Sequence, residues 1–362
     1  MKKLLLSLFL IFSFVAALIY TGFMPDGFYS WVDSFAPPGV SGALQNIGGA
    51  RSVMEEDVHP PHPPPPPRRP GPADIANDDT DDEPLDLDDP KLMPGDADCI
   101  IKCVLDGVRA MEKEIKIPLM LPDDSDDAVT EYFIGALEQA IDNIRREMPE
   151  IFWLYLGSFG IEWSGNRESR EGTLTVHLNY SYTPGKVAVM REEINRVIND
   201  LVSAAPSDPL EAAAFFHDWI VEHTYYASHV AEIAESNGDL QNYGYAFNIN
   251  GIFLRGSAVC EGFSKAYKLL CDLAGIPCIN AFGVADGENH SWNYVQLDNV
   301  WYLVDATWNA PVSSPKVMLR DYFLKGSRSI INGRTISEIY KNDSSDYPPL
   351  SPVGYFERTI EN

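Results

Sequence analysis

The sequence has few basic residues and few cysteines. Its 27 lysines and arginines stand against 53 aspartates and glutamates in 362 residues, which gives a formal net charge of −26 at pH 7. A surface this acidic repels phosphates, so a nucleic-acid-binding protein is disfavoured. The five cysteines leave one over after any pairing, and no CxxC, HExxH or calcium-loop pattern is present. We therefore expect no zinc site, no EF-hand calcium and no cofactor.

Enough apolar residues are present to exclude a wholly disordered acidic chain, since 45% of residues are hydrophobic and 11% are aromatic. The acidic excess is unevenly distributed. Residues 1–50 carry no net charge, residues 51–98 carry −10 and residues 99–362 carry −16. Much of the acidity thus belongs to one short segment, and it says little about a substrate.

The N-terminal segment indicates export. Lys2 and Lys3 precede an uncharged run from Leu4 to Met24, which is long enough to cross a hydrocarbon core of about 30 Å with the lysines left in the cytoplasm. The small residues at 15–17 suit signal-peptidase cleavage, whereas the continued apolar run slightly favours an uncleaved membrane anchor. No cysteine directly follows the run, so a lipid anchor is not expected.

The next segment has the composition of a linker. Residues 59–72 read HPPHPPPPPRRPGP, which predicts a polyproline II spacer of roughly 40 Å. The acidic residues that follow repel one another and extend the chain. A ligand for a proline-recognition domain is the alternative, and the spacer is favoured.

The folded part has the patterns of an α+β protein. Apolar spacing predicts helices over residues 98–111, 127–148, 187–204 and 209–223, and strands over residues 151–156 and 173–182. Alternation in the second strand places His177 on its polar face. His217 and His223, on the last of these helices, are expected to be structural or surface residues.

Cys260 stands where a glycine-containing loop gives way to a helix that ends before Gly275 and Pro277. A thiol in the first turn lies at the positive end of the helix dipole, near unpaired backbone N–H groups, and both stabilise the thiolate. The pattern is typical of a nucleophilic cysteine. A small buried hydrophobic residue is the alternative for any single cysteine.

The hairpin that follows brings a histidine and a carboxylate together. If residues 298–299 form a two-residue turn, strand pairing puts Asp305 opposite Trp292. Side-chain alternation then places His290 on the same face as both, so the His290 and Asp305 side chains can reach one another. We expect the helix that bears Cys260 to dock against this face.

Two segments strongly resemble the catalytic core of the transglutaminase-like superfamily, in its secreted or membrane-anchored bacterial form: AVCEGFSKAYKLLCDLAGIPC and HSWNYVQLDNVWYLVDATWN. The resemblance implies an α+β, papain-like fold with the nucleophile at a helix N-terminus packed on an antiparallel sheet. It also implies that Cys260 is the nucleophile, His290 the general base and acid, and Asp305 the residue that orients the imidazole.

The implied function is thiol acyl transfer on protein or peptide amides by a membrane-anchored or secreted protein outside the cytoplasm. Hydrolysis is slightly favoured over transglutaminase crosslinking, because water is the abundant acceptor there. A catalytically inactive transglutaminase-like binding module at the cell surface is the alternative. The Cys260 N–H and one upstream donor would meet the oxyanion. Four residues are candidates for that donor: Gln241, Tyr243, Asn248 and Asn250.

These patterns divide the chain into five segments. They are a signal peptide or N-terminal membrane anchor at 1–24, a disordered linker at 25–98, an α+β N-terminal region at 99–207, a transglutaminase-like catalytic core at 208–312 and a C-terminal extension of the core at 313–362.

Two further sets of side chains have expected places. Core packing beneath the hairpin is favoured over a place in a substrate cleft for three tryptophans: Trp292, Trp301 and Trp308.

In a helix Cys99 and Cys103 would hold their Cβ atoms about 6 Å apart, which is too far for a disulfide unless that segment starts non-helically. Cys271 and Cys278 either stay reduced in the core or form a bridge.

Overall fold

The computed structural model describes residues 97–120, 126–166, 168–236, 238, 240, 242–310 and 319–360. These residues fall into two compact units, and the smaller one holds residues 227–244, with helix α8 (Ser228–Glu235). All other described residues belong to the larger unit. The predicted export segment and nearly all of the predicted linker lie outside the described residues. Within the described ranges, no helix combines the length and apolar character needed to cross a membrane.

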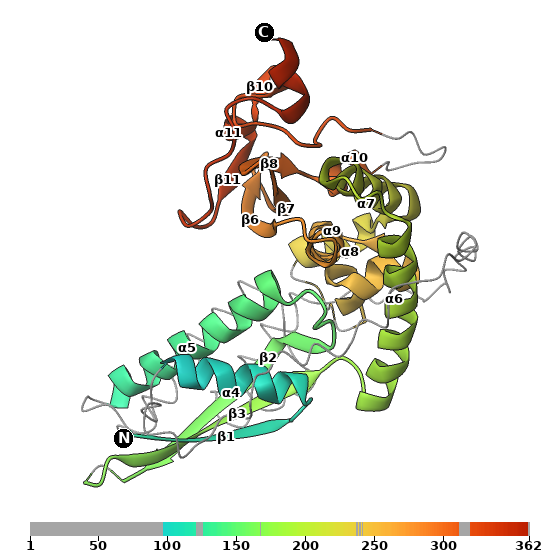
Figure 1. The fold of residues 1–362 in the computed structure, drawn as a ribbon. Coiled ribbons are helices and arrows are strands. Elements are labelled where there is room, and N and C mark those ends of the chain that lie inside the picture. Colours follow the sequence, from blue (N-terminus) through green and yellow to red (C-terminus); the bar gives the residue numbers. More distant parts are fainter. Residues whose placement is uncertain are drawn as a thin grey trace. The chain divides into compact units, whose positions relative to one another are not determined.

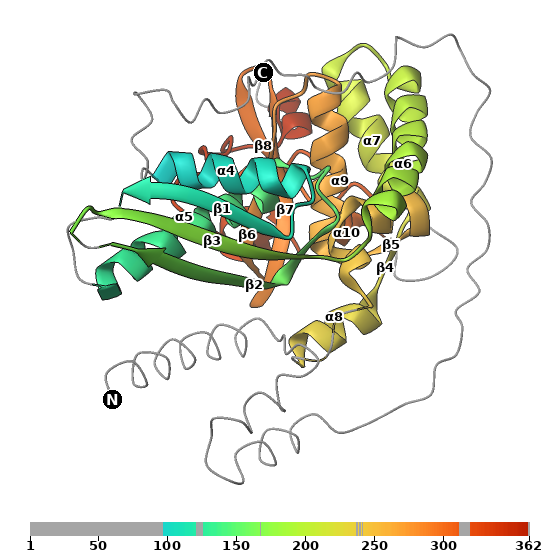
Figure 2. The same ribbon diagram turned by 90° about the horizontal axis from the view of Figure 1, so that it is seen from below.

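The N-terminal part of the larger unit is an antiparallel sheet covered on one face by two helices (Figures 1 and 2). The strands lie in the order β1-β3-β2, and the elements are β1 (Glu114–Met120), β2 (Leu154–Gly165), β3 (Glu171–Tyr180), α4 (Ala97–Arg109) and α5 (Asp126–Glu147). Burial alternates strictly along β1 because its apolar residues face the helices. His177 lies on the other face with 40% of its side chain exposed, as predicted.

One strand boundary differs from the prediction. The strand expected at 151–156 begins at Leu154 and continues to Gly165. Residues 151–153 are an apolar triplet with less than 5% exposure each, buried in the core ahead of the strand. Their hydrophobicity predicts a strand, but these three residues pack in the core without pairing to a neighbouring strand.

Two long helices connect this part to the second sheet. α6 (Pro184–Ala204) begins three residues earlier than expected, because the Thr183 side chain caps it and accepts from the Lys186 N–H. α7 (Pro209–His223) begins as predicted, with Asp208 accepting from the Glu211 N–H at 3.0 Å.

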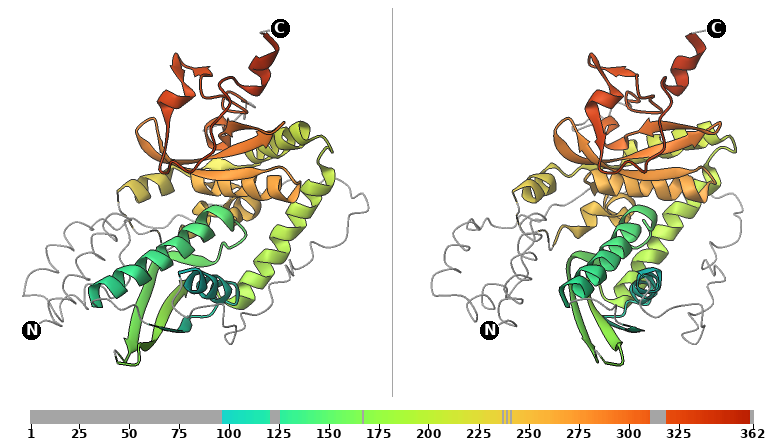
Figure 3. Two further views of the ribbon diagram at one scale, coloured as in Figure 1. Left: turned by 60° about the vertical axis from the view of Figure 1, so that its left-hand side comes forward. Right: turned by 90° about the vertical axis from the view of Figure 1, so that its left-hand side faces the viewer.

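The second sheet is antiparallel, has the strand order β11-β6-β7-β8 and lies between two layers. Its strands are β6 (Cys278–Ala285), β7 (Glu288–Leu297), β8 (Val300–Val304) and β11 (Tyr340–Asn342). Helix α9 (Cys260–Leu273) packs on one face, and the C-terminal segment covers the other (Figure 3). The remaining short elements are β4 (Tyr225–Tyr226), β5 (Ser257–Ala258), α10 (Ala306–Asn309), β9 (Ile330–Ile331), β10 (Arg334–Thr335), α11 (Ile336–Ile339), a π-turn at Gly251–Arg255 and 3₁₀ turns at Gly244–Phe247 and Tyr355–Ile360.

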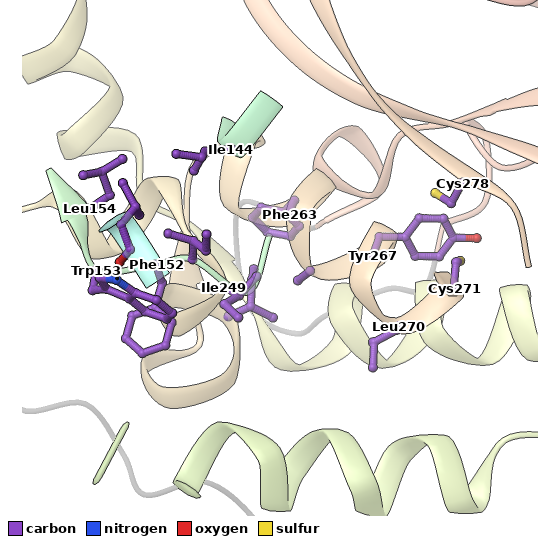
Figure 4. Packing of buried hydrophobic residues seen from close by; sticks show 14 of the residues in the cluster. Ile144, Phe152, Trp153, Leu154, Ile249, Phe263, Tyr267, Leu270, Cys271 and Cys278 are labelled. Atoms are coloured by element: carbon purple, nitrogen blue, oxygen red, sulfur yellow. Dashed lines mark hydrogen bonds between the residues drawn. The ribbon is translucent and has the colours of Figure 1, made fainter. Parts of the chain in front are cut away.

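A single apolar core runs from the first sheet to helix α9 (Figure 4). Tyr267 is fully buried there and donates its hydroxyl to the Ala213 carbonyl at 3.1 Å. Cys271 and Cys278 lie beside its ring, and both are buried free thiols. Cys99 and Cys103 are free as well, on the helix where their spacing disfavours a bridge.

Candidate active site

Cys260 is the first residue of α9. Val259 caps the helix in an extended conformation, and its N–H is bound to the Ala246 carbonyl at 2.9 Å. The Cys260 N–H occupies the first helical position, where no intrahelical acceptor exists. The side chain is partly exposed, in contrast to the buried residues that follow it. Both features are what a nucleophile at a helix N-terminus requires.

Gly262 lets the loop before the site approach the first turn of α9. A Cβ atom at this position would lie 2.6 Å from the Ala246 carbonyl oxygen and 2.8 Å from the Ala258 Cβ. Both distances are shorter than real Cβ contacts, so a larger residue would push the loop away. The backbone around Cys260 is therefore held between two tightly packed segments.

The predicted hairpin register is confirmed. Leu297 pairs with Val300 and Asn293 with Val304, so Asp298 and Asn299 form the two-residue turn. Their φ angles of 53° and 60° are those of a type I′ turn, which twists in the same sense as the strands.

His290 and Asp305 meet as the register predicts. The His290 Nε2 atom lies 2.8 Å from the Asp305 Oδ2 atom, and the side chains are 7% and 0% exposed. The Cys260 side chain also interacts with the imidazole and contributes to the raised pKa of His290. The structure therefore brings the three sequence-predicted site residues into one chain of contacts.

The face on which α9 docks was predicted wrongly. Helix α9 packs against the odd-numbered residues of β7, since the Asn293 side chain donates to the Ser264 carbonyl at 2.9 Å. His290 points to the opposite face, with Trp292, which belongs to a separate apolar cluster. The first turn of α9 reaches the imidazole near the beginning of β7. Alternation assigns faces within the sheet, but it does not determine which face a helix covers.

Asp305 is fixed by donors from three directions. It caps α10, where its Oδ1 atom accepts from the Trp308 N–H at 3.1 Å. Its Oδ2 atom accepts from His290 and from the Tyr340 hydroxyl, each at 2.8 Å. Tyr340 lies on β11 in the C-terminal extension, 35 residues away, and no spacing in the sequence could have indicated it.

Aromatic rings cover the imidazole. The Trp308 ring stacks on His290 at 4.9 Å between centroids and an interplanar angle of 25°. Trp292 is 1% exposed and packs in the core, as expected. Trp308 also packs against the Tyr322 and Tyr340 rings, so it joins the imidazole to the aromatic cluster on that face.

The surroundings of His290 favour its charged form. Burial alone would lower the pKa of this imidazole, but the Asp305 carboxylate and the hydrogen bonds to Asp305 and Cys260 raise it from 6.5 to about 10. At neutral pH the imidazole is therefore protonated, with the Asp305 carboxylate on its Nε2 atom.

The four candidates for the second oxyanion donor lie in different surroundings. Gln241 lies outside the described residues, and Tyr243 belongs to the smaller unit. Asn248 Oδ1 accepts from Lys265 at 3.1 Å, and the Asn250 side-chain amide donates to the Tyr182 hydroxyl at 3.0 Å.

Within the described ranges, no group of three or more histidine, cysteine, aspartate or glutamate side chains is arranged to hold a metal ion. His217 and His223 have structural partners. His217 is fully buried between Asp218, at 3.0 Å, and Asn309, at 2.8 Å. His223 contacts the Trp219 carbonyl at 2.7 Å.

Helix α9 with Cys260 at its N-terminus, packed on an antiparallel sheet that carries His290 and is followed by Asp305, has the arrangement of a papain-like, transglutaminase-like fold. Residues 196–306 match the family model described as the transglutaminase-like superfamily. These residues of the chain therefore form a transglutaminase-like domain. The match overlaps the predicted core at 208–312 and includes all three residues of the site.

Similar proteins include the kyphoscoliosis peptidases of Mus musculus and Homo sapiens. The mouse protein is 27% identical over 133 residues, which are 33% of this chain and 19% of the mouse protein. The human protein is 27% identical over 129 residues, 32% of this chain and 18% of the human protein. The chain thus spans about a fifth of the length of these relatives. A crystal structure of a TGase is 17% identical and covers 54% of this chain and 52% of that chain, with a TM-score of 0.30.

Proposed function

We propose that this protein is a thiol acyl-transfer enzyme that acts on protein or peptide amides outside the cytoplasm. The observation that supports this most strongly is the His290 imidazole, which is hydrogen-bonded to Asp305 at 2.8 Å and interacts with the Cys260 side chain. A binding module would not need a buried imidazolium between a thiol and a fixed carboxylate.

The chemistry follows from the charges of these groups. The thiolate of Cys260 attacks the amide carbonyl, and a tetrahedral oxyanion forms beside the Cys260 N–H. The imidazolium of His290 gives its proton to the departing amine, which leaves a thioester on the enzyme. Asp305 holds the ring in place and stabilises its charged form during both steps. A second nucleophile, activated by neutral His290, then resolves the thioester.

Hydrolysis is the reaction we favour over crosslinking. Water is the abundant acceptor outside the cytoplasm, and the curated relatives carry the name peptidase. In the alternative reaction the amine of a lysine side chain resolves the thioester and joins two proteins. The extracytoplasmic location rests on the uncharged run at 4–24 behind two lysines, in a segment outside the described residues.

Incubation of the purified protein with a protein substrate mixture and a fluorescent primary amine tests the reaction. New peptide N-termini or carboxyl ends without incorporated amine would support hydrolysis, and fluorescent protein bands would support crosslinking. Both products must vanish in a Cys260→Ala variant and persist in a Cys103→Ala variant, which removes a thiol on α4. Absence of both from the wild-type protein, across a broad substrate set, would favour the inactive binding module.

A further inference from the structure

The residue after the nucleophile is a buried glutamate that belongs to an ion cluster. Glu261 lies in the first turn of α9, and 9% of its side chain is exposed. Arg145 binds both of its carboxylate oxygens, Nε to Oε1 at 3.1 Å and Nη2 to Oε2 at 2.8 Å. Lys265, one turn further along α9 and 3% exposed, binds Oε1 at 2.9 Å.

The cluster joins three parts of the chain at the nucleophile. Arg145 belongs to α5 in the N-terminal region, 116 residues before Glu261. Lys265 also donates to the Asn248 side chain at 3.1 Å and to the Phe247 carbonyl at 3.3 Å, in the loop before the site. The α5 helix, this loop and the first turn of α9 are therefore tied together through one carboxylate.

The cluster carries a net positive charge. Burial alone would raise the pKa of Glu261, but Arg145 and Lys265 lower it to about 2, so the carboxylate is ionised. Burial lowers the pKa of Lys265 from its usual value of 10.5, and Glu261 opposes this. While Lys265 is protonated, two cations and one anion leave an excess of one positive charge beside the first turn. The Arg145 side chain is 41% exposed, but Glu261 and Lys265 are nearly buried. Burying these two charges is costly in stability compared with apolar packing, so their placement next to Cys260 calls for a role.

We infer that Arg145, Glu261 and Lys265 are positioning residues that hold the first turn of α9 in place and set the electrostatic potential felt by the Cys260 thiolate. The inference rests on the proposed function, because it concerns the nucleophile of that reaction. It makes the N-terminal region part of the working site, since α5 supplies one of the two cations. The positive excess adds to the helix dipole in stabilising the thiolate.

Other charged groups lie near the thiol or near the cluster. His290 on β7 interacts with both Cys260 and Asp305, Arg255 lies on the turn before the site, and Arg146 and Asp142 lie beside Arg145 on α5. Arg255 lies 4.0 Å over the Tyr245 ring, and Arg146 is paired with Asp142 at 2.6 Å. All of them except Arg146, which the control variant replaces, stay unchanged in the variants below, so the shifts of the alkylation midpoint report on the cluster.

The test measures the pH midpoint of iodoacetamide alkylation at Cys260 in the full chain, by peptide mapping. Arg145→Met removes a cation and should raise the midpoint, whereas Glu261→Gln removes an anion and should lower it, each by about half a pH unit to one unit. Arg145→Met/Glu261→Gln restores the net charge and should return the midpoint to the wild-type value. Arg146→Met, one residue along α5, is the matched control and should leave it unchanged.

A purely structural role predicts a different pattern, because loosening the first turn moves the midpoint in the same direction in both single variants. If the alkylation midpoint shifts in the same direction in Arg145→Met and Glu261→Gln, or does not shift in either, the inference is wrong. Glu261→Gln keeps the side chain's shape and decides the question by itself if Arg145→Met does not fold. If wild-type Cys260 is alkylated only at the high pH typical of a free thiol, the proposed function fails. The signs of the midpoint shifts in the two variants still test the effect of the cluster on Cys260 separately.

Discussion

Asp305 illustrates how much of a site depends on groups that never touch a substrate. Its carboxylate receives one hydrogen bond from its own helix, one from His290 and one from Tyr340. These donors fix the side chain in a site where it is 0% exposed. A carboxylate fixed in this way can hold the imidazole in one orientation while that ring gains and loses its proton.

Asp305→Asn should lower the pKa of His290 from about 10 to a value near or below 6.5, because burial then acts without the compensating charge. NMR titration of the imidazole protons measures this directly. A raised folded-state pKa contributes stability that is fully present below pH 6.5 and is lost as the pH rises toward 10. The difference in unfolding free energy between wild type and variant should shrink over that window. If the difference in unfolding free energy does not change with pH, Asp305 is not the group that raises the pKa of His290.

Tyr340→Phe removes one donor to Asp305 and leaves the ring packed against Trp292. A hydrogen bond to a charged group contributes about 1.5–3 kcal/mol, so we expect kcat/KM to fall by roughly tenfold or more with a small change in KM. Tyr347→Phe is the control from the same extension, because the Tyr347 hydroxyl binds Arg146 and Asp343 instead. Equal losses in both variants would indicate a general effect on the extension.

At the scale of elements, the β7–β8 hairpin shows what local sequence determines. The turn residues and the strand alternation predict the register, and the register predicts that His290 meets Asp305. These interactions lie within 15 residues of one another. The docking face of α9 was not predictable in the same way, because it depends on which of two apolar faces the helix and the C-terminal segment each cover.

Gly262 in the first turn of α9 is the element-scale position most sensitive to a side chain. Gly262→Ala should lower the free energy of unfolding by about 1–3 kcal/mol, because the new Cβ lies 2.6 Å from the Ala246 carbonyl. Gly135→Ala in α5 is the matched control, since nothing lies within 4 Å of its Cβ, and it should stabilise by about 0.5–1 kcal/mol. Urea unfolding of both variants checks the opposite signs. A stabilised Gly262→Ala variant would show that the loop is not packed tightly against the first turn.

At the scale of the larger unit, the parts least accessible to sequence reasoning are its long-range contacts. Arg145 reaches Glu261 from 116 residues away, and Tyr340 reaches Asp305 from 35 residues away. Neither pair has a spacing or motif in the sequence that marks it. The N-terminal region and the C-terminal extension both contribute to a site whose three central residues the hairpin and helix patterns identified.

The continuous core predicts cooperative unfolding of the larger unit. Residues of α4, α5 and the first sheet share one apolar cluster with α7, α9 and β8, and Arg145 links the same parts by charge. Calorimetry should therefore show one transition for these parts, with calorimetric and van't Hoff enthalpies that agree. Two resolved transitions, with the first removing the N-terminal sheet alone, would contradict a single core.

The central claim is that Cys260 is a thiolate stabilised by an imidazolium, and four other thiols provide the internal comparison. Cys99, Cys271 and Cys278 are buried, and Cys103 is partly buried, with burial and the neighbouring Cys99 raising its pKa to about 11. Below pH 7 these four should react little, so a site-resolved label reports on Cys260.

Alkylation with iodoacetamide between pH 5 and 9, followed by peptide mapping of wild type and His290→Ala, is the most direct measurement. We expect Cys260 to be labelled selectively below pH 7 and much more slowly in the variant, because the thiolate loses its counter-charge. Labelling of Cys260 only above pH 8, at the same rate with and without His290, would contradict the claim.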